Sequence, residues 1–147
     1  MALITMPVTL VTAGGAALIN AWLALRVGLV RRAEGISIGD GGDPTLATRM
    51  RAQANFVENA PFILILIGLI EYAQGPSIWL WVVSAVFLIV RVAHALGMEG
   101  LRHGRLAGAL VTLVLLVLLG LYAIVLPFRE PPRTQIELPV ESLPSRG

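Results

Sequence analysis

The fold of this chain is decided by residues 106–126, LAGALVTLVLLVLLGLYAIVL, a run of 21 residues without a charged side chain. A helix needs about 20 apolar residues to cross the hydrocarbon core of a bilayer, so the run predicts a membrane-spanning helix. Three more apolar stretches of nearly sufficient length, separated by Gly- and Pro-containing segments, lie at 7–30, 46–72 and 78–96. The sequence therefore predicts an all-α, integral membrane, antiparallel four-helix bundle.

Composition supports this class and excludes others. Hydrophobic residues make up 56% of the 147-residue chain and charged residues 14%, and the mean hydropathy is +0.82, outside the range of soluble domains. Basic residues form no cluster that predicts nucleic-acid binding. Cysteine is absent, so any thiol must come from a substrate, and two histidines do not predict a metal site. We expect one membrane domain, 1–127, followed by a Pro-rich polar tail, 128–147.

The orientation of the bundle is predicted from arginines near the span ends. The second loop has none, whereas the first and third loops are flanked by or contain Arg31, Arg32, Arg49, Arg51, Arg102 and Arg105. Short loops rich in basic residues stay in the cytoplasm. Loops one and three are therefore predicted to be cytoplasmic and both termini extracytoplasmic.

Polar residues inside spans are costly and mark functional or paired positions. Asp43-Pro44 predicts a second helix that starts in the polar loop, and Arg51, Asn55 and Glu58 then form one stripe at i, i+4, i+7. On the third helix, which returns to the same side, the comparable stripe is formed by Arg91, His94 and Met98. With Arg105 at the start of the fourth helix, these groups suit a peptide-like zwitterion.

Structural roles remain open for the same residues. An intramembrane salt bridge is the alternative to ligand contact for Glu58, and capping and interhelical hydrogen bonds are the alternatives for Arg51 and Asn55. His94 is explained by an interhelical hydrogen bond, and Arg105 by the ordinary basic signal beside a span.

Residues 49–61, RMRAQANFVENAP, resemble the signature of the MAPEG family, the membrane-associated proteins of eicosanoid and glutathione metabolism. The pattern Arg-Ala-Gln-x-Asn-x-x-Glu-x-x-Pro is met at every position of 51–61. The resemblance covers roughly residues 7–126. It implies homotrimers with a glutathione pocket between subunits.

The resemblance also implies roles for individual residues. It places glutathione binding on Arg51, Gln53, Asn55, Glu58, Arg91 and His94, with Gln53 directed at a neighbouring subunit. Catalytic roles fall on Arg105, which would hold the thiolate, and on Arg31 or Arg32, one of which would assist substrate protonation. The chain departs from the eicosanoid enzymes by carrying Asn59, His94 and Met98 where they have aromatic hydroxyls. In this it is similar to the small bacterial members.

The expected function is thus a glutathione-dependent transferase or peroxidase of the bacterial inner membrane. Glutathione would be the co-substrate, and lipophilic electrophiles or lipids would enter from the bilayer. Two alternatives stay open: a non-catalytic lipid-binding or scaffold member of the same fold, favoured by the missing tyrosines, and a small four-span transporter that uses Glu58 for proton coupling.

Overall fold

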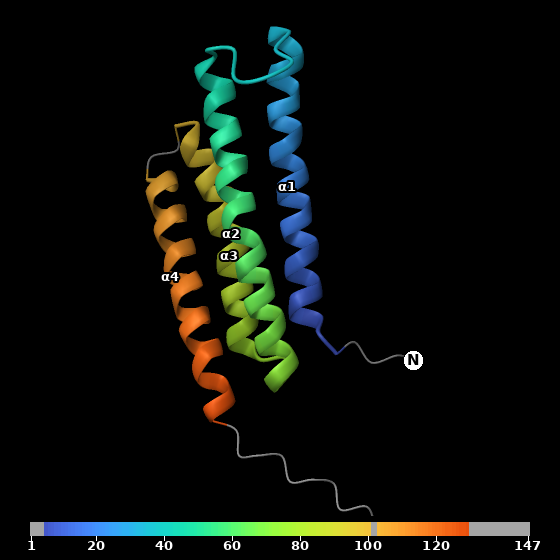
Figure 1. Cartoon of the computed structure of the whole chain (residues 1–147), viewed down its shortest axis with the longest axis vertical. Coiled ribbons are helices and arrows are strands. Elements are labelled where there is room, and N and C mark those ends of the chain that lie inside the picture. Colours follow the sequence, from blue (N-terminus) through green and yellow to red (C-terminus); the bar gives the residue numbers. More distant parts are fainter. Residues whose placement is uncertain (1–4, 101–102, 130–147) are drawn as a thin grey trace, which may run out of the picture.

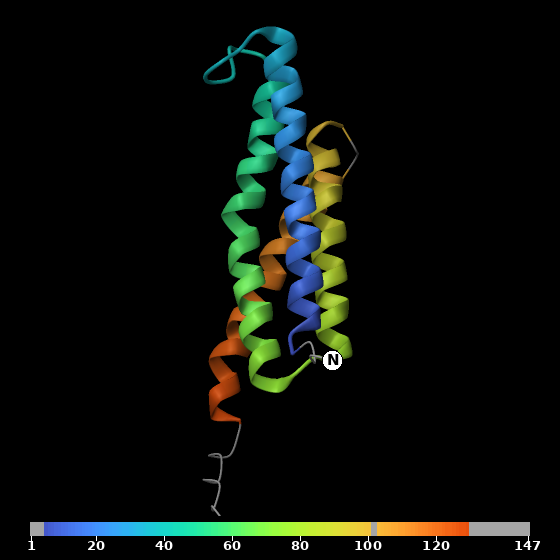
Figure 2. The ribbon, with the colours of Figure 1, turned by 90° about the vertical axis from the view of Figure 1, so that its right-hand side faces the viewer.

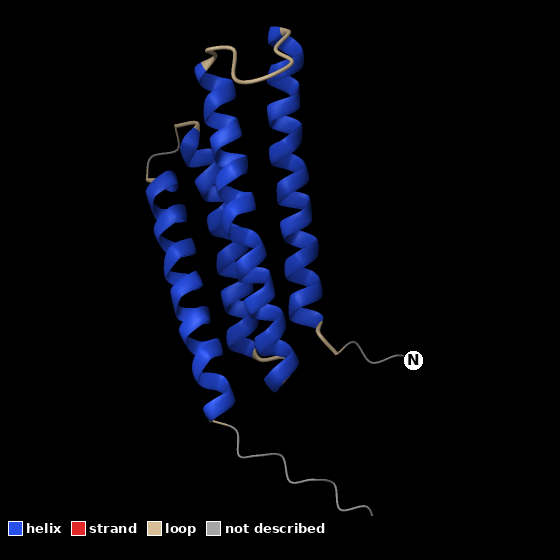
Figure 3. Ribbon diagram, in the orientation of Figure 1, coloured by secondary structure: helices blue, strands red, loops and turns tan. Residues whose placement is uncertain are grey.

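The computed structural model describes residues 5–100 and 103–129, which form four helices (Figures 1 and 3). These are α1 (Pro7–Glu34), α2 (Pro44–Gln74), α3 (Ile78–Met98) and α4 (Gly104–Val125), and a 3-10 turn (Leu126–Phe128) follows α4. Successive helices run in opposite directions (Figure 1), which confirms the antiparallel bundle. The expected tail begins within the 3-10 turn, and its residues from 130 onward, like Arg102 of the third loop, lie outside the described residues.

All four helices are long and apolar enough to cross a membrane, with mean hydropathies of 1.7, 1.6, 2.0 and 2.9 in chain order. Large apolar side chains also cover the outside of the bundle, for example Leu18 on α1, Phe62 on α2, Ile89 on α3 and Leu113 on α4. An outer surface of this kind is stable in lipid and unstable in water. The chain is therefore a multi-pass integral membrane protein.

The first two helices are longer than the other two and project beyond them at one end. As predicted, α2 starts in the polar loop, where a carboxylate oxygen of Asp43 accepts a hydrogen bond from the Leu46 amide at 2.6 Å. The first helix continues to Glu34 and ends at Gly35, whose φ of 65° is the left-handed conformation that glycine adopts without strain. With 28 and 31 residues against 21 and 22, the α1–α2 hairpin extends past the α3–α4 hairpin (Figures 1 and 2).

The two central helices, α2 and α3, carry most of the core. In the described residues α1 packs mainly on α2, α4 packs mainly on α3, and α1 makes no contact with α4. Side chains that are completely buried include Ile63 and Ile67 of α2 and Leu80 and Phe87 of α3. Figure 2 shows α4 inclined to the other helices, and residues of α2 and of the first turns of α4 line a common cavity.

A buried carboxylate closes the opposite end of the bundle, and the sequence did not predict it. Glu71, near the end of α2, is 1% exposed and accepts hydrogen bonds from the first turn of α1. The donors are the Val8 amide at 2.8 Å, the Thr9 amide at 2.7 Å and the Thr9 hydroxyl at 2.6 Å. Met6, the residue before the helix, gives α1 no side-chain cap. Glu71 therefore satisfies amides that would be unpaired in lipid and places a negative charge at the positive end of the helix dipole.

We predict that Glu71→Gln destabilises the protein by about 1–3 kcal/mol. The glutamine side chain lacks the negative charge and has only one acceptor oxygen, while the donors at the start of α1 remain shielded from water. The measurement is unfolding of the purified protein in mixed detergent micelles. Glu34→Gln, at an exposed position that ends α1, is the matched control and should leave the unfolding midpoint unchanged. Equal midpoints for the two variants would contradict the capping role.

Candidate functional site

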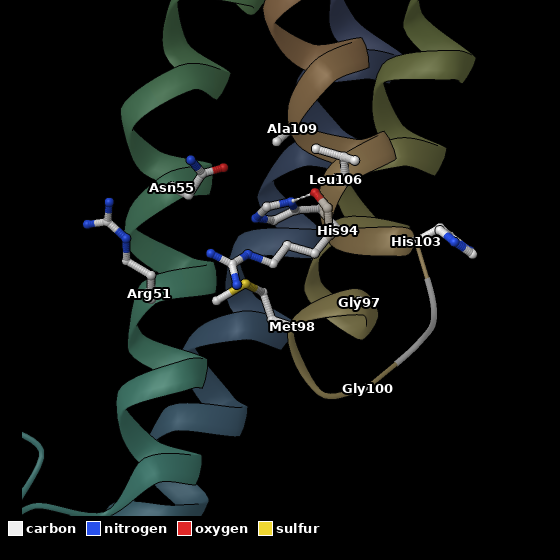
Figure 4. A pocket seen from close by; sticks show the side chains of 10 residues that line it. Arg51, Asn55, His94, Gly97, Met98, Gly100, His103, Leu106 and Ala109 are labelled. Carbon is white, nitrogen blue, oxygen red and sulfur yellow. Dashed lines mark hydrogen bonds between the residues drawn. The ribbon is translucent and has the colours of Figure 1, made fainter.

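A cavity of about 760 Å³ lies between α2 and the start of α4, at the end of the bundle that carries the first and third loops. Figure 4 shows α2 on one side of it and the α3–α4 turn on the other. Its lining comes from three helices and the turn and consists of Arg51, Asn55, His94, Gly97, Met98, Gly100, His103, Arg105, Leu106 and Ala109. Four of the residues predicted from the sequence are therefore brought together: Arg51, Asn55, His94 and Arg105.

The α3–α4 wall of the cavity depends on two glycines at close helix contacts. A side chain at Gly97 would overlap the backbone of Gly104 and Arg105, and one at Gly108 would lie 2.7 Å from the Val90 carbonyl oxygen. Only glycine permits such an approach between backbones. The absence of side chains at these two positions therefore fixes where α4 starts relative to the end of α3.

His94 adds a polar contact to this wall. Its Nδ1 lies 3.0 Å from the carbonyl oxygen of Arg105. A carbonyl oxygen only accepts hydrogen bonds, so Nδ1 carries the hydrogen, and Nε2 is the acceptor of the neutral ring. The interhelical hydrogen bond considered for His94 is present, and the same residue lines the cavity.

Arg91 lies behind the cavity wall and does not line it. Its side chain is 1% exposed, and NH1 donates to Oδ1 of Asn55 at 3.0 Å and to the Thr112 hydroxyl at 3.4 Å. The guanidinium also lies over the ring of Phe56, 5.3 Å from its centroid. Because the amide oxygen of Asn55 is engaged, its NH₂ group remains to donate to a ligand. In this single chain, Arg91 thus acts on the cavity through Asn55.

Three predicted site residues lie away from the cavity of the single chain. Glu58 is exposed on α2, and Gln53 is half-buried on the same helix. Arg31, near the end of α1, donates to the sulfur of Met50 at 3.3 Å. Since α1 does not touch α4, Arg31 and Arg105 belong to separate parts of the chain.

The ionisable side chains that line the cavity are all basic. Two guanidinium groups and two imidazoles contribute to its lining, whereas none of the described lining residues has a carboxylate. The N-terminus of α4, the positive end of its dipole, lies in the same wall. A site of this composition favours an anion.

The nearest carboxylate to the turn, that of Glu99, is already paired. It binds Arg26 of α1 and Arg49 of α2, the latter at 2.6 Å. Burial alone would raise the pKa of Glu99, but the Arg49 hydrogen bond and the charges of Arg26 and Arg49 outweigh it and hold that pKa below its usual value. Glu99 is therefore ionised at neutral pH.

Glu71 and Glu99 were missed because neither belongs to a motif. The topology could have indicated both residues. Each is an acidic residue near a helix end, and the antiparallel order places it beside groups on another helix that need a partner. For Glu71 the partner is the uncapped start of α1, and for Glu99 it is one arginine of α1 together with one of α2.

The comparison with protein families decides the affiliation. The sequence model of the MAPEG family matches residues 9–125, which is most of the chain and includes all four helices. The chain belongs to the MAPEG family. The cavity of this MAPEG protein lies within the matched region. A search of curated proteins finds no similar sequence.

We predict that Gly97→Ala lowers the stability of this MAPEG protein by about 1–3 kcal/mol, the usual effect of overpacking, because the added methyl group must displace the start of α4. Gly120→Ala is the matched control, since a methyl group there meets open space. That control should be neutral or stabilising by up to about 1 kcal/mol through helix propensity. Thermal unfolding in detergent compares them, and equal stability of the two variants would refute the close contact at Gly97.

Proposed function

We propose that this MAPEG protein is a glutathione-dependent transferase or peroxidase that acts on lipophilic electrophiles. The observation that carries the proposal is the cationic cavity beside the N-terminus of α4. We further propose that the cavity opens on the cytoplasmic side of a bacterial inner membrane, with both termini on the other side. The basic residues of the first loop support this orientation.

The lining of the cavity matches the chemistry of glutathione. The tripeptide carries two carboxylates, and Arg51 and the NH₂ group of Asn55 offer donors for them from α2. Arg105 and the start of α4 lie in the facing wall, where the thiol would be held. Because the chain has no cysteine, the co-substrate must supply the sulfur nucleophile.

Activation of the thiol follows from the same electrostatics. A free thiol has a pKa of about 8.5, and a neighbouring guanidinium or helix N-terminus lowers it by stabilising the thiolate. In the transferase reaction the thiol proton leaves to solvent, the thiolate forms a bond to an electrophilic carbon, and the leaving group departs with the bonding electrons. In the peroxidase reaction two glutathione molecules become a disulfide and reduce a hydroperoxide to an alcohol and water.

The position of the cavity suits a lipophilic second substrate. Leu106 and Ala109 are exposed on α4 and also line the cavity. An apolar molecule dissolved in the bilayer can therefore approach along α4 and meet the thiolate without crossing water.

We also propose that the protein acts as a homotrimer. Arg51 and Glu58 are exposed on α2, in one stripe with the exposed side chains of Phe62 and Leu69. A charged side chain such as Glu58 is costly when it faces lipid, and a second copy of the chain can cover it. A neighbouring subunit would then bring Gln53 or Arg31 to the site, which the single chain does not do.

One observation favours the non-catalytic alternative. No tyrosine is among the described residues that line the cavity, so a thiolate would receive no aromatic hydroxyl. If purified protein binds glutathione but shows no thiol-dependent turnover of a generic electrophile such as 1-chloro-2,4-dinitrobenzene, the lipid-binding or scaffold role is favoured.

We predict that Arg51→Ala and Asn55→Ala each weaken glutathione binding by about 1–3 kcal/mol, as expected for a lost charge-assisted contact. Calorimetry on the purified protein in detergent measures the affinity. Arg129→Ala, at an exposed position after α4 and at the opposite end of the bundle, is the control and should bind as the parent does. Unchanged affinity of the two cavity variants would assign Arg51 and Asn55 to helix packing.

We predict that Arg105→Ala raises the pKa of the bound thiol while leaving most of the affinity for glutathione intact, because the peptide is held from α2. Ultraviolet thiolate absorbance against pH reports the ionisation. Arg105→Lys should recover part of the effect, since it keeps the charge but not the planar guanidinium. Coincident titration curves for the parent and Arg105→Ala would remove Arg105 as the activating group.

A further inference from the structure

Three helices meet at one carboxylate near the cavity. Glu99, which follows α3 directly, binds Arg26 of α1 with one oxygen and Arg49 of α2 with the other. Arg49 also donates to the Arg26 carbonyl oxygen at 3.0 Å, and the Arg26 guanidinium lies 4.5 Å from the ring centroid of Trp22. The Arg26–Arg49–Glu99 cluster is therefore a connected network that fastens the end of α3 to both α1 and α2.

The cluster is attached to the cavity through the residues around Glu99. Met98 and Gly100, on either side of Glu99 in the chain, both line the cavity. Gly97, which precedes Met98 in the chain, packs directly on the backbone at Arg105. A movement of Glu99 is thus transmitted by close contacts to the wall that carries Arg105.

Among the described residues, no hydrogen bond or ion pair at the cavity itself joins its α2 wall to its α4 wall. Arg51 and Asn55 stand on α2, Arg105 stands on α4, and the cavity of about 760 Å³ separates them. Deeper in the bundle the Arg91–Asn55 contact joins α3 to α2. Nearer the loops, the described ionic contacts between α3 and α2 are those of Glu99 with Arg49.

We propose that Glu99 is a positioning residue that sets the distance between Arg105 and the Arg51–Asn55 pair, so that one ligand contacts both walls at once. The proposal rests on the proposed function in taking glutathione as that ligand. The positioning itself is a property of the chain and is testable without a ligand. The ion pairs of Glu99 are partly open to solvent, where ion pairs contribute little to global stability, so the expected role of Glu99 is geometric.

The experiment compares Glu99→Gln with Glu34→Gln in the full-length protein in detergent. Glu34, like Glu99, is an exposed carboxylate at this end of the bundle, but it makes no ion pair among the described residues. Hydrogen–deuterium exchange is followed in peptides covering residues 95–110, with residues 7–14 at the far end as an internal reference. We expect faster exchange at 95–110 in Glu99→Gln alone, with the reference unchanged in both variants.

Glutathione affinity supplies the second readout. Loss of simultaneous contact with both walls should weaken binding roughly tenfold, the effect of losing one contact of about 1.4 kcal/mol, at an unchanged melting temperature. Arg49→Gln should behave like Glu99→Gln, and the double variant should add little to either, because all three remove the same link. A parent-like affinity in Glu99→Gln, or fully additive losses in the double variant, would overturn the proposal.

The two proposals fail in different ways. If the parent does not bind glutathione, the proposed function fails, and exchange alone decides the role of Glu99. Exchange at 95–110 that is raised only in Glu99→Gln supports positioning. Exchange that is equal in Glu99→Gln and Glu34→Gln overturns it, whatever the ligand.

Discussion

The structure depends on the requirement that polar groups within a bilayer find their partners inside the protein. Arg91 shows how this requirement organises the bundle. Its buried guanidinium is bound by the amide oxygen of Asn55 on α2 and the hydroxyl of Thr112 on α4, so α3 holds both neighbours through one side chain. Among the described residues both hydrogen-bond partners of this guanidinium are neutral and its Nε has none, so no negative charge behind the cavity cancels its positive charge.

Near the ends of the helices, polar groups also find their partners inside the protein, and there the partners are carboxylates. At one end the amides that begin α1 are bound by Glu71 from α2. At the other end Glu99 binds arginines of α1 and α2. Acidic residues therefore join helices at both ends of the bundle, whereas the cavity between α2 and α4 has arginines and histidines in its lining. This separation leaves the cationic groups of the cavity available to an anionic ligand.

Much of the fold was predictable because span length and apolar content depend on local sequence. The start of α2 at Asp43-Pro44 was predicted for the same reason, since a cap and a proline act within one turn. The grouping of Asn55 with His94 and Arg105 followed from helical periodicity and the antiparallel order. What periodicity does not specify is the rotation of a helix about its own axis in the bundle. For that reason the contact of Arg91 with Asn55 and the partners of Glu71 and Glu99 were not predicted, and the predicted ligand contact of Arg91 stays a prediction.

The glycine contacts between α3 and α4 determine which wall of the cavity can change its shape. At Gly97 and Gly108 the backbones of α3 and α4 are in direct contact. No side chains separate the two helices there, so we expect the α3–α4 hairpin to be rigid. The α2 side faces the cavity with long, adjustable side chains such as Arg51. The cavity can therefore change shape by rotation of such side chains, while α2 itself stays joined to α3 by the Arg91–Asn55 and Glu99–Arg49 contacts. Exposed side chains change rotamer within picoseconds to nanoseconds, far faster than packed helices move, so this wall is expected to adjust quickly.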